Sequence, residues 1–234
     1  MATNLLALII TFALALAWLR INDFTAHRGW ISSDLSRKII HMGTGPIFVL
    51  CWLMFSNTAY ARYLAALVPL AITTQFVLVG TGIIKDESAV KAMSRTGDRR
   101  EILRGPLFYG IIFVLMTVIF WYDSPIGIVA LMLMCGGDGL ADILGRRLGK
   151  VKLPWNKRKS WIGSLGMLVG GWLFAMLILA IFVFTGKFRP PVSGYVSAVT
   201  IIAIAGTLVE TLPIQDIDNI TVTLTAVFLG LLLF

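Results

Sequence analysis

The sequence predicts an all-α fold: a polytopic integral membrane helical bundle of about seven or eight transmembrane helices, in a single domain over residues 1–234. Apolar residues make up 58% of the chain and charged residues only 14%, whereas charged residues make up about 25% of ordinary soluble domains. The mean hydropathy is correspondingly high, at +0.87. The apolar residues gather into long runs without strand-like alternation, and a helix of roughly 20 such residues crosses a hydrocarbon core of about 30 Å.

The first four runs are bounded by polar or charged residues. The run 4–20 is rich in leucine, isoleucine and alanine and reaches an arginine. The run 39–55 follows two basic residues, and the run 62–84 stops before a lysine. The run 105–121 begins directly after another arginine. Each of these segments is therefore predicted to be one membrane helix.

The last four runs follow the same pattern. The run 125–145 carries two acids near its end and is followed by a basic loop. The run 162–185 contains no charged residue, the run 194–212 carries one acid near its end, and the run 220–234 completes the sequence. Because the second, fourth and eighth runs are short for a crossing, the number of membrane helices stays open between seven and eight.

The basic residues are distributed unevenly along the chain. Most of the 20 lysines and arginines fall in three loops, residues 20–38, 85–104 and 146–160. With eight crossings these loops share one side of the membrane, which the positive-inside rule identifies as the cytoplasmic face, and both termini lie on the opposite side. Topology thus accounts for the net charge of +8, which does not indicate a nucleic-acid partner.

Two acids, Asp138 and Asp142, lie one helical turn apart near the cytoplasmic end of the run 125–145. Charged residues inside a membrane are costly and are usually functional. Residues at i and i+4 share a helix face, so the two carboxylates could hold a divalent cation, most fittingly Mg²⁺. The alternative is an ordinary ion pair, since Asp142 and Arg146 also have the i, i+4 spacing.

Other polar residues are predicted to reach the same face. His41 begins the second run, Glu210 lies near the end of the seventh, and Asp216 and Asp218 follow it. Each could be an interfacial residue without a chemical role. Each of His41, Glu210 and Asp218 could also be a general base, and an acid is preferred to the histidine.

The loop 146–160 has more basic residues than orientation requires. Lys157 and Lys159, with Arg146 at its start, could bind phosphate groups as point charges and forks. Ser160 could cap the following helix, which would leave the amides of Gly163 and Ser164 to bind anionic oxygens. The alternative is a helix cap combined with binding of anionic lipids. No P-loop, dinucleotide fingerprint or protein-kinase motif accompanies this loop.

The chain resembles the polyprenol kinase family, most closely its phytol kinases, with dolichol kinase and CTP-dependent diacylglycerol kinase as distant relatives. The resemblance runs in order from about residue 35 to the end. Its motifs are Arg37-Lys-Ile-Ile-His41, Arg104-Gly-Pro-Leu-Phe-Tyr109, Cys135-Gly-Gly-Asp-Gly-Leu-Ala-Asp142 with Gly145-Arg146, Lys152-Leu-Pro-Trp-Asn-Lys-Arg-Lys-Ser160 with Gly163-Ser164, Glu210-Thr-Leu-Pro213 and Asp218-Asn-Ile-Thr-Val222.

The resemblance implies an integral membrane kinase that transfers a phosphoryl group from a nucleoside triphosphate, CTP, to a long-chain isoprenoid alcohol, first of all phytol. Composition and spacing do not distinguish CTP from ATP, or phytol from another prenol. The alternatives are a CTP-dependent diacylglycerol or dolichol kinase, and a non-enzymatic lipid transporter. A transporter site is expected near the membrane midplane between repeated halves, whereas these acids lie towards one face.

The predicted partners are the alcohol, the nucleotide and the lipid bilayer; nucleic acid is excluded and the oligomeric state is not assigned. Catalysis is assigned to Asp138, Asp218, Glu210 and His41. No basic residue precedes the first run and no arginine-rich transit segment is present. This favours a bacterial, cyanobacterial-type multi-pass membrane protein or a processed organellar one, with its active site on the cytoplasmic face.

Overall fold

The computed structural model describes residues 2–94, 96–214 and 217–234. Arg95 of the basic loop 85–104 and Asp216 lie outside these ranges. Within them every regular element is helical, which confirms the predicted fold class. The elements are α1 (Ala2–His27), α2 (Ser33–Cys51), η1 (Trp52–Met54), α3 (Ala61–Thr81), α4 (Glu87–Met93), η2 (Arg99–Leu103), α5 (Gly105–Ile119), α6 (Ile126–Met132), η3 (Leu133–Gly137), α7 (Asp138–Leu148), α8 (Trp161–Phe184), η4 (Val192–Tyr195), α9 (Val196–Glu210) and α10 (Asp218–Leu233).

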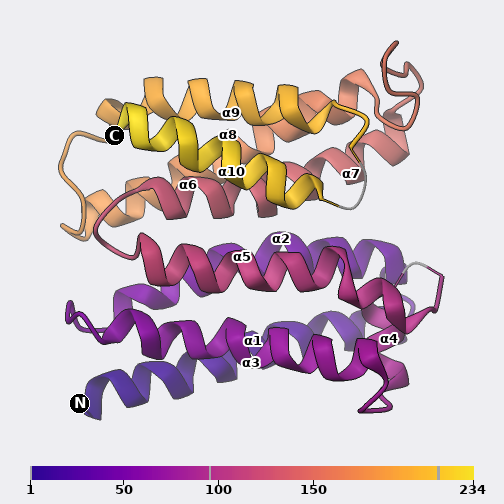
Figure 1. Cartoon of the computed structure of the whole chain (residues 1–234), viewed down its shortest axis with the longest axis horizontal. Coiled ribbons are helices and arrows are strands. Elements are labelled where there is room, and N and C mark those ends of the chain that lie inside the picture. Colours follow the sequence, from indigo (N-terminus) through magenta and orange to yellow (C-terminus); the bar gives the residue numbers. More distant parts are fainter. Residues whose placement is uncertain (1, 95, 215–216) are drawn as a thin grey trace.

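Six of the described helical stretches are long and apolar enough to cross a membrane. They comprise α1, α3, η2 with α5, α6 to α7, α8, and η4 with α9. Of the other two predicted crossings, α10 has only 16 residues, and α2 carries Asp34, Arg37 and Lys38 in its first turns. Both nevertheless run alongside the longer helices (Figure 1).

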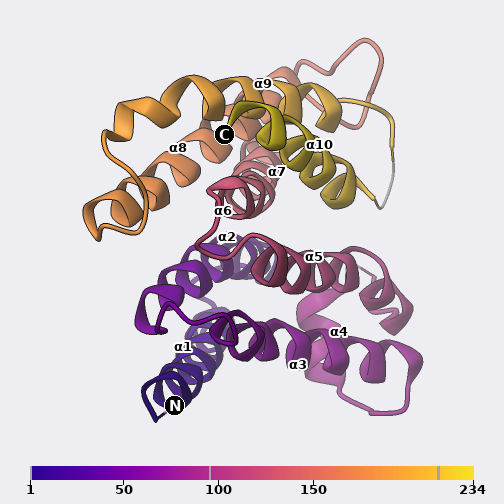
Figure 2. The same ribbon diagram turned by 60° about the vertical axis from the view of Figure 1, so that its left-hand side comes forward.

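The helices form two groups, α1 to α5 and α6 to α10, which lie one above the other in Figures 1 and 2. In the first group α1 packs on α2 and α3, and α3 packs on α5. In the second group α8 packs on α7 and α9, and α9 packs on α10. The groups meet where α2 contacts α7 and η3, and where α5 contacts α6 and α10.

The segment from α6 to α7 is the central helix of the bundle. Every residue from Ile126 to Gly137 is buried, as expected for a membrane helix that is apolar on all sides and surrounded by other helices. The sequence predicted one uninterrupted helix over 125–145. The structure instead contains a π-helical turn, η3, between α6 and α7, and π turns inside α-helices often occur at functional sites.

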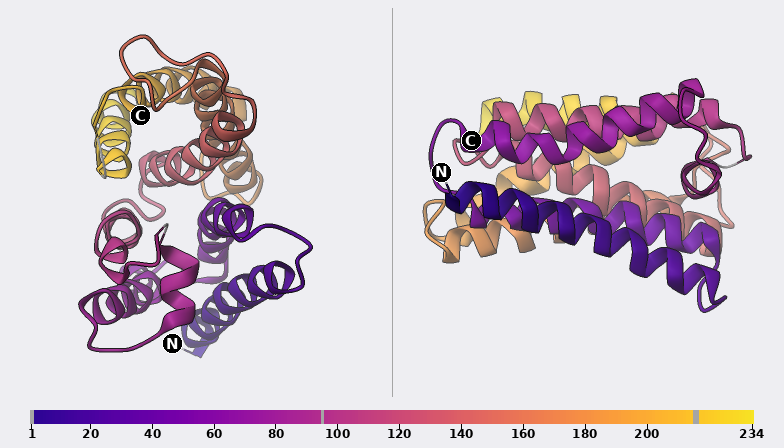
Figure 3. Two further views of the ribbon diagram at one scale, coloured as in Figure 1. Left: turned by 90° about the vertical axis from the view of Figure 1, so that its right-hand side faces the viewer. Right: turned by 90° about the horizontal axis from the view of Figure 1, so that it is seen from below.

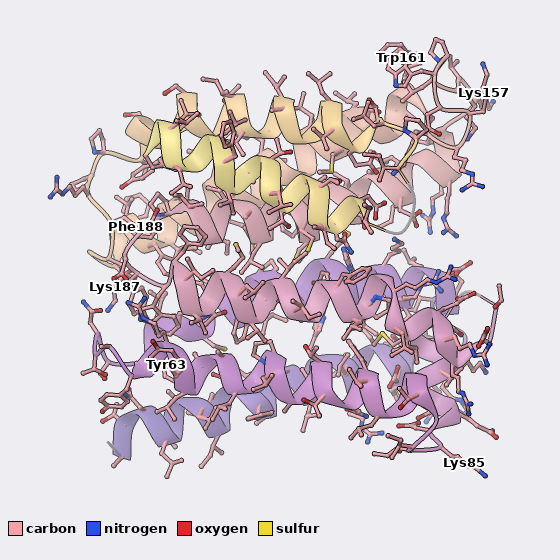
Figure 4. All side chains as sticks on the ribbon, viewed as in Figure 1. Tyr63, Lys85, Lys157, Trp161, Lys187 and Phe188 are labelled. Carbon is pink, nitrogen blue, oxygen red and sulfur yellow. The ribbon has the colours of Figure 1, made fainter. Side chains whose placement is uncertain are left out.

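The connections agree with the predicted topology. The α1–α2, α3–α5, α7–α8 and α9–α10 connections lie at one end of the bundle, here called the basic end, and both termini lie at the other (Figure 1). Lys85 and Lys157 mark the basic end, whereas Lys187 lies at the opposite end (Figure 4). The short helix α4, which the sequence did not predict, lies in the α3–α5 connection.

This arrangement predicts which loops share a compartment. A single reporter cysteine in place of Lys157 should react with a membrane-impermeant maleimide from one side of sealed vesicles, and one in place of Lys187 only from the other side. Cys51 and Cys135 are buried and should contribute little background. Labelling of both reporter positions from the same side would contradict the topology.

Candidate functional site

The predicted site residues lie together around one cavity of about 1180 Å³ at the basic end. They come from α2, α7, α8, α9, α10 and the α7–α8 loop, so residues far apart in the sequence meet here. All eleven line the cavity: His41, Asp138, Asp142, Arg146, Lys157, Lys159, Ser160, Gly163, Ser164, Glu210 and Asp218.

Asp138 begins α7, directly after the π turn. Its carboxylate faces α2, where Lys38 Nζ lies 3.8 Å and His41 Nε2 lies 3.3 Å from Asp138 Oδ2. Lys38 and His41 are three residues apart and therefore share one face of α2. Asp138 is 24% exposed on its side chain, which leaves it reachable from the cavity.

The π turn is closely packed on α8. A Cβ atom on Gly136 would lie within 2.8 Å of three atoms of Phe174, and one on Gly137 within 2.7 Å of the Met167 sulfur. Glycine at these two positions therefore leaves room for the Phe174 and Met167 side chains of α8. The turn also presents the carbonyl oxygen of Met134 to His41 Nε2, at 3.2 Å.

The contacts of His41 indicate the role of its Nε2. This nitrogen faces two acceptors, the Met134 carbonyl oxygen and an Asp138 carboxylate oxygen, so Nε2 acts as a hydrogen-bond donor. The ring also packs against Tyr109, with centroids 4.5 Å apart, and the Tyr109 hydroxyl donates to the His41 carbonyl oxygen at 2.8 Å. His41 is therefore held between Asp138, the π turn and α5.

Three carboxylates from three different helices, with Asp138 among them, converge near His41. Asp138 of α7, Glu210 at the end of α9 and Asp218 at the start of α10 each offer an oxygen within 4.8 Å of the others. Lys159 lies among them: its ammonium group contacts Glu210 and is 3.8 Å from Asp218 Oδ2. Burial alone would lower the pKa of Lys159, but Glu210, Asp138 and Asp218 outweigh it and raise that pKa.

Asp142, which the sequence predicted to share a cation with Asp138, is not a member of this three-carboxylate group. Asp142 instead accepts a hydrogen bond from Arg146 Nε at 2.9 Å and lies 3.3 Å from Lys38 Nζ. The ordinary i, i+4 ion pair left open by the sequence is therefore present. The oxygens that approach Asp138 belong to Glu210 and Asp218, which sequence spacing within one helix could not reveal.

The α7–α8 loop is folded back on itself, and this places Lys159. Leu153 is fully buried, and its amide donates to the carbonyl oxygen of Lys159 at 3.1 Å. The side-chain amide of Asn156 donates to the carbonyl oxygens of Thr211 and Leu212, at 3.1 and 3.2 Å. The loop is thus fixed to the end of α9, beside Glu210.

Ser160 caps α8 as predicted, since its Oγ accepts a hydrogen bond from the Gly163 amide at 3.2 Å. The Ser164 amide donates to the Ser160 carbonyl oxygen at 2.9 Å. The sequence predicted that these two amides bind anionic oxygens, whereas in this structure both are bonded within the cap. Ser160 is 2% exposed, and its Oγ is used in this cap.

The sequence missed two residues of the site. Lys38 was counted in a basic loop and quoted within a motif, but it was given no role in the site, although its three-residue spacing from His41 was a usable signal. Tyr109 was quoted only within a motif, and nothing local indicated that its hydroxyl would bind the backbone of α2. Nothing in the sequence indicated the tether formed by Asn156.

The chain is similar to curated plant proteins over most of its length, whereas no family model and no solved structure matches it. A "Probable phytol kinase, chloroplastic" of Triticum aestivum is 41% identical over 230 residues, covering 97% of this chain and 77% of that protein. "Farnesol kinase, chloroplastic" of Arabidopsis thaliana is 42% identical over 209 residues, covering 88% and 68%. "Phytol kinase 1, chloroplastic" of the same plant is 40% identical over 209 residues, covering 88% and 69%.

Proposed function

Because the chain belongs to the polyprenol kinase family, together with phytol and farnesol kinases, we propose that it is a membrane kinase that phosphorylates an isoprenoid alcohol. Phytol is the proposed acceptor and CTP the proposed donor. The observation that carries the assignment within this structure is the convergence of Asp138, Glu210 and Asp218 beside Lys159. Acids that bind a cation, next to bases that bind phosphate, are what a metal–nucleotide complex requires.

The three carboxylates fit a divalent cation, most plausibly Mg²⁺, because they supply hard oxygen donors from three sides. When bound, such an ion neutralises the charge of the transferring phosphoryl group and orients it. Asp142 stays outside this set in the proposal, since Lys38 and Arg146 already pair with it. Its role is then to hold those two cations at the cavity wall.

Phosphoryl transfer depends mainly on positioning and on charge neutralisation. Lys159 and Lys157, on the tethered loop, would bind the phosphates as point charges, and Arg146 would bind them through its planar fork. Arg146 is about half exposed and lines the cavity, so it can exchange its contact with Asp142 for one with a phosphate. Lys38 adds a fourth positive charge on the opposite wall.

The base that accepts the proton of the alcohol is proposed to be Asp218. Its side chain is 36% exposed, against 5% for Glu210, and it lies in the first turn of α10 at the cavity wall. Glu210 is engaged by Lys159. His41 donates its Nε2 hydrogen towards Asp138, and its proposed role is to position that carboxylate.

The membrane location of the protein and the compartment that its site faces rest on different observations. Six described helical stretches can cross a membrane, and the positive-inside rule orients the basic end towards the compartment in which the protein is made. We therefore propose that the site faces that compartment, the cytoplasm in a bacterium or its equivalent in an organelle. The relatives are named chloroplastic, which does not support the predicted bacterial membrane.

The direct test of this function is a donor and acceptor panel. Purified protein incubated with labelled CTP and Mg²⁺ should phosphorylate phytol faster than geranylgeraniol, dolichol or diacylglycerol, measured as labelled lipid phosphate. ATP in place of CTP decides the donor, and chelation of divalent cations should abolish turnover. A protein that moves these lipids between liposome leaflets without nucleotide, and forms no lipid phosphate, would be a transporter.

The carboxylate cluster predicts a large effect of one isosteric change. Asp138→Asn should lower kcat by about 100-fold or more, because it removes a charge that orients the metal–nucleotide complex. Asp123→Asn is the matched control: Asp123 is an exposed acid paired with Arg62, outside the cavity. Turnover of Asp138→Asn within about threefold of Asp123→Asn would remove Asp138 from the site.

The tethered loop predicts a nucleotide effect at one lysine. Lys159→Ala should raise the KM for nucleotide about tenfold and lower kcat, because the phosphates lose a charge and Glu210 loses its partner. Lys159→Arg should recover part of the loss. Lys150→Ala, an exposed position of the same loop outside the cavity lining, serves as control. Equal KM values for Lys159→Ala and Lys150→Ala would show that the loop is only structural.

A further inference from the structure

The cavity continues beyond the charged residues into the first helix group. There it is lined by α1, α2, α3 and α5, which surround a common space, and α4 lies across the basic end of that space (Figure 3). The lining changes character along the way, from charged side chains near the acids to aliphatic and aromatic ones. Ala15, Leu19, Ile47, Phe48, Ile72 and Phe113 are representative of this part, which is called the apolar chamber below.

The chamber has a closed floor. Thr11, Phe48, Val68 and Phe113 line its far end, and each is no more than 5% exposed. The only hydroxyl in this set belongs to Thr11, and it donates to the Ala7 carbonyl oxygen within α1. The floor therefore offers no polar group to a ligand and suits a hydrocarbon end.

The other end of the chamber leads to the reactive groups. His41 and Tyr109 connect α2 to α5. Their rings pack against each other, and the Tyr109 hydroxyl donates to the His41 carbonyl oxygen. Both residues line the cavity beside Asp138. At the roof, the Arg37 guanidinium donates to the Ser94 carbonyl oxygen at 3.0 Å and so fixes the end of α4 to α2. A long ligand in the chamber would thus have one end at the carboxylates and the rest among apolar side chains.

We expect a ligand in a cavity with this lining. Protein interiors are packed as densely as organic crystals and contain few voids larger than a water molecule. An apolar hollow does not hold ordered water well, since water needs two or more polar partners. The whole cavity, with its charged part included, measures about 1180 Å³, against roughly 300–1,000 Å³ for most ligand sites. A hydrocarbon chain would restore the missing contacts.

We infer that the apolar chamber enclosed by α1, α2, α3 and α5 binds the isoprenoid chain of the alcohol, and that its depth sets the preferred chain length. This inference rests on the proposed kinase function and names the part of the protein that selects the substrate. The hydroxyl end then lies beside His41 and Tyr109, facing Asp138 and Asp218, and the methyl-branched end points to Phe48 and Phe113.

The depth of the chamber can be set against chain length. From Val68 to Phe76 the lining residues of α3 cover about 12 Å at roughly 1.5 Å per residue. An extended chain advances about 1.2 Å per bond, since a three-bond peptide unit spans at most ~3.6 Å. About ten bonds therefore fit in extended form. A hemiterpenoid alcohol, with four bonds, therefore reaches about 5 Å down and a monoterpenoid alcohol, with eight, about 10 Å, whereas a diterpenoid chain of about sixteen bonds must fill the chamber and bend.

A substitution at Ala15 tests whether the depth of the apolar chamber sets the preferred chain length. It lies one helical turn above Thr11 and one turn below Leu19 on the same face of α1, about 6 Å above the floor, and it lines the chamber. Ala15→Trp should block the lower half. It should reduce kcat/KM for phytol about tenfold or more, for farnesol less, and for 3-methylbut-2-en-1-ol, whose four bonds stay above Ala15, by no more than about threefold. Ala15→Leu should give an intermediate shift.

Ala13→Trp is the matched control. Ala13 lies on the same helix but is exposed and outside the cavity lining, so the same substitution there should leave the order of the three alcohols unchanged. Equal losses for phytol and 3-methylbut-2-en-1-ol in both Ala15 variants would overturn the inference, because blocking a tail site cannot affect a short chain as much as a long one. A shift of the same size in Ala13→Trp would overturn it as well.

A second measurement separates this inference from the proposed function. A phytol analogue with a photoreactive diazirine at its hydrocarbon end should label peptides of α1 and α5 that contain residues 11–19 and 110–116. Excess phytol should compete, and Ala15→Trp should lose the label. Labelling confined to the exposed faces of α8 to α10 would overturn the chamber assignment even if the kinase is active. Chamber labelling without any alcohol phosphorylation would instead retain the site and overturn the kinase.

Discussion

A carboxylate withdrawn from water must have cationic or hydrogen-bonding partners, and this requirement organises the basic end of the bundle. Asp138, Asp142 and Glu210 are at most about one quarter exposed, and each is paired: with Lys38, with Arg146 or with Lys159. Removal of one member of such a pair typically costs about 3–5 kcal/mol. The positive charges that orient the protein in its membrane thus also make a buried acidic site tolerable.

The fold supplies these partners by bringing distant segments to one place. The central helix from α6 to α7 carries Asp138 to the surface of the bundle core, and α2 presents the Lys38 ammonium group and the His41 imidazole to it. The loop after α7 returns Lys159 to the same spot because Asn156 binds the backbone that follows α9. Rigid helices therefore hold the acids, whereas a short tethered loop holds the lysine, an arrangement suited to a cation that must exchange partners.

Much of this could be predicted from the sequence, and the failures have physical reasons. Long apolar runs and uneven basic loops predicted the helices and their direction, because membrane insertion acts on composition. The charged residues that line the cavity were also singled out, since charge is conspicuous in an apolar chain. Which of these residues are neighbours could not be predicted. Helical spacing links Asp138 to Asp142, but Glu210 and Asp218 come from other helices. The apolar chamber was invisible, because its lining residues are of the same types as those that face lipid.

The π turn before Asp138 has a consequence for the geometry of α7. Successive residues of an α-helix are rotated by about 100° around its axis, since one turn takes 3.6 residues. A π turn accommodates one residue more than an α turn, so η3 shifts the angular phase of everything after it relative to α6. Because of this rotation, α6 is buried on all sides while both aspartates of α7 face α2, and the central helix remains continuous. The one extra residue of the π turn thereby separates the buried part of the central helix from the part that carries the acids.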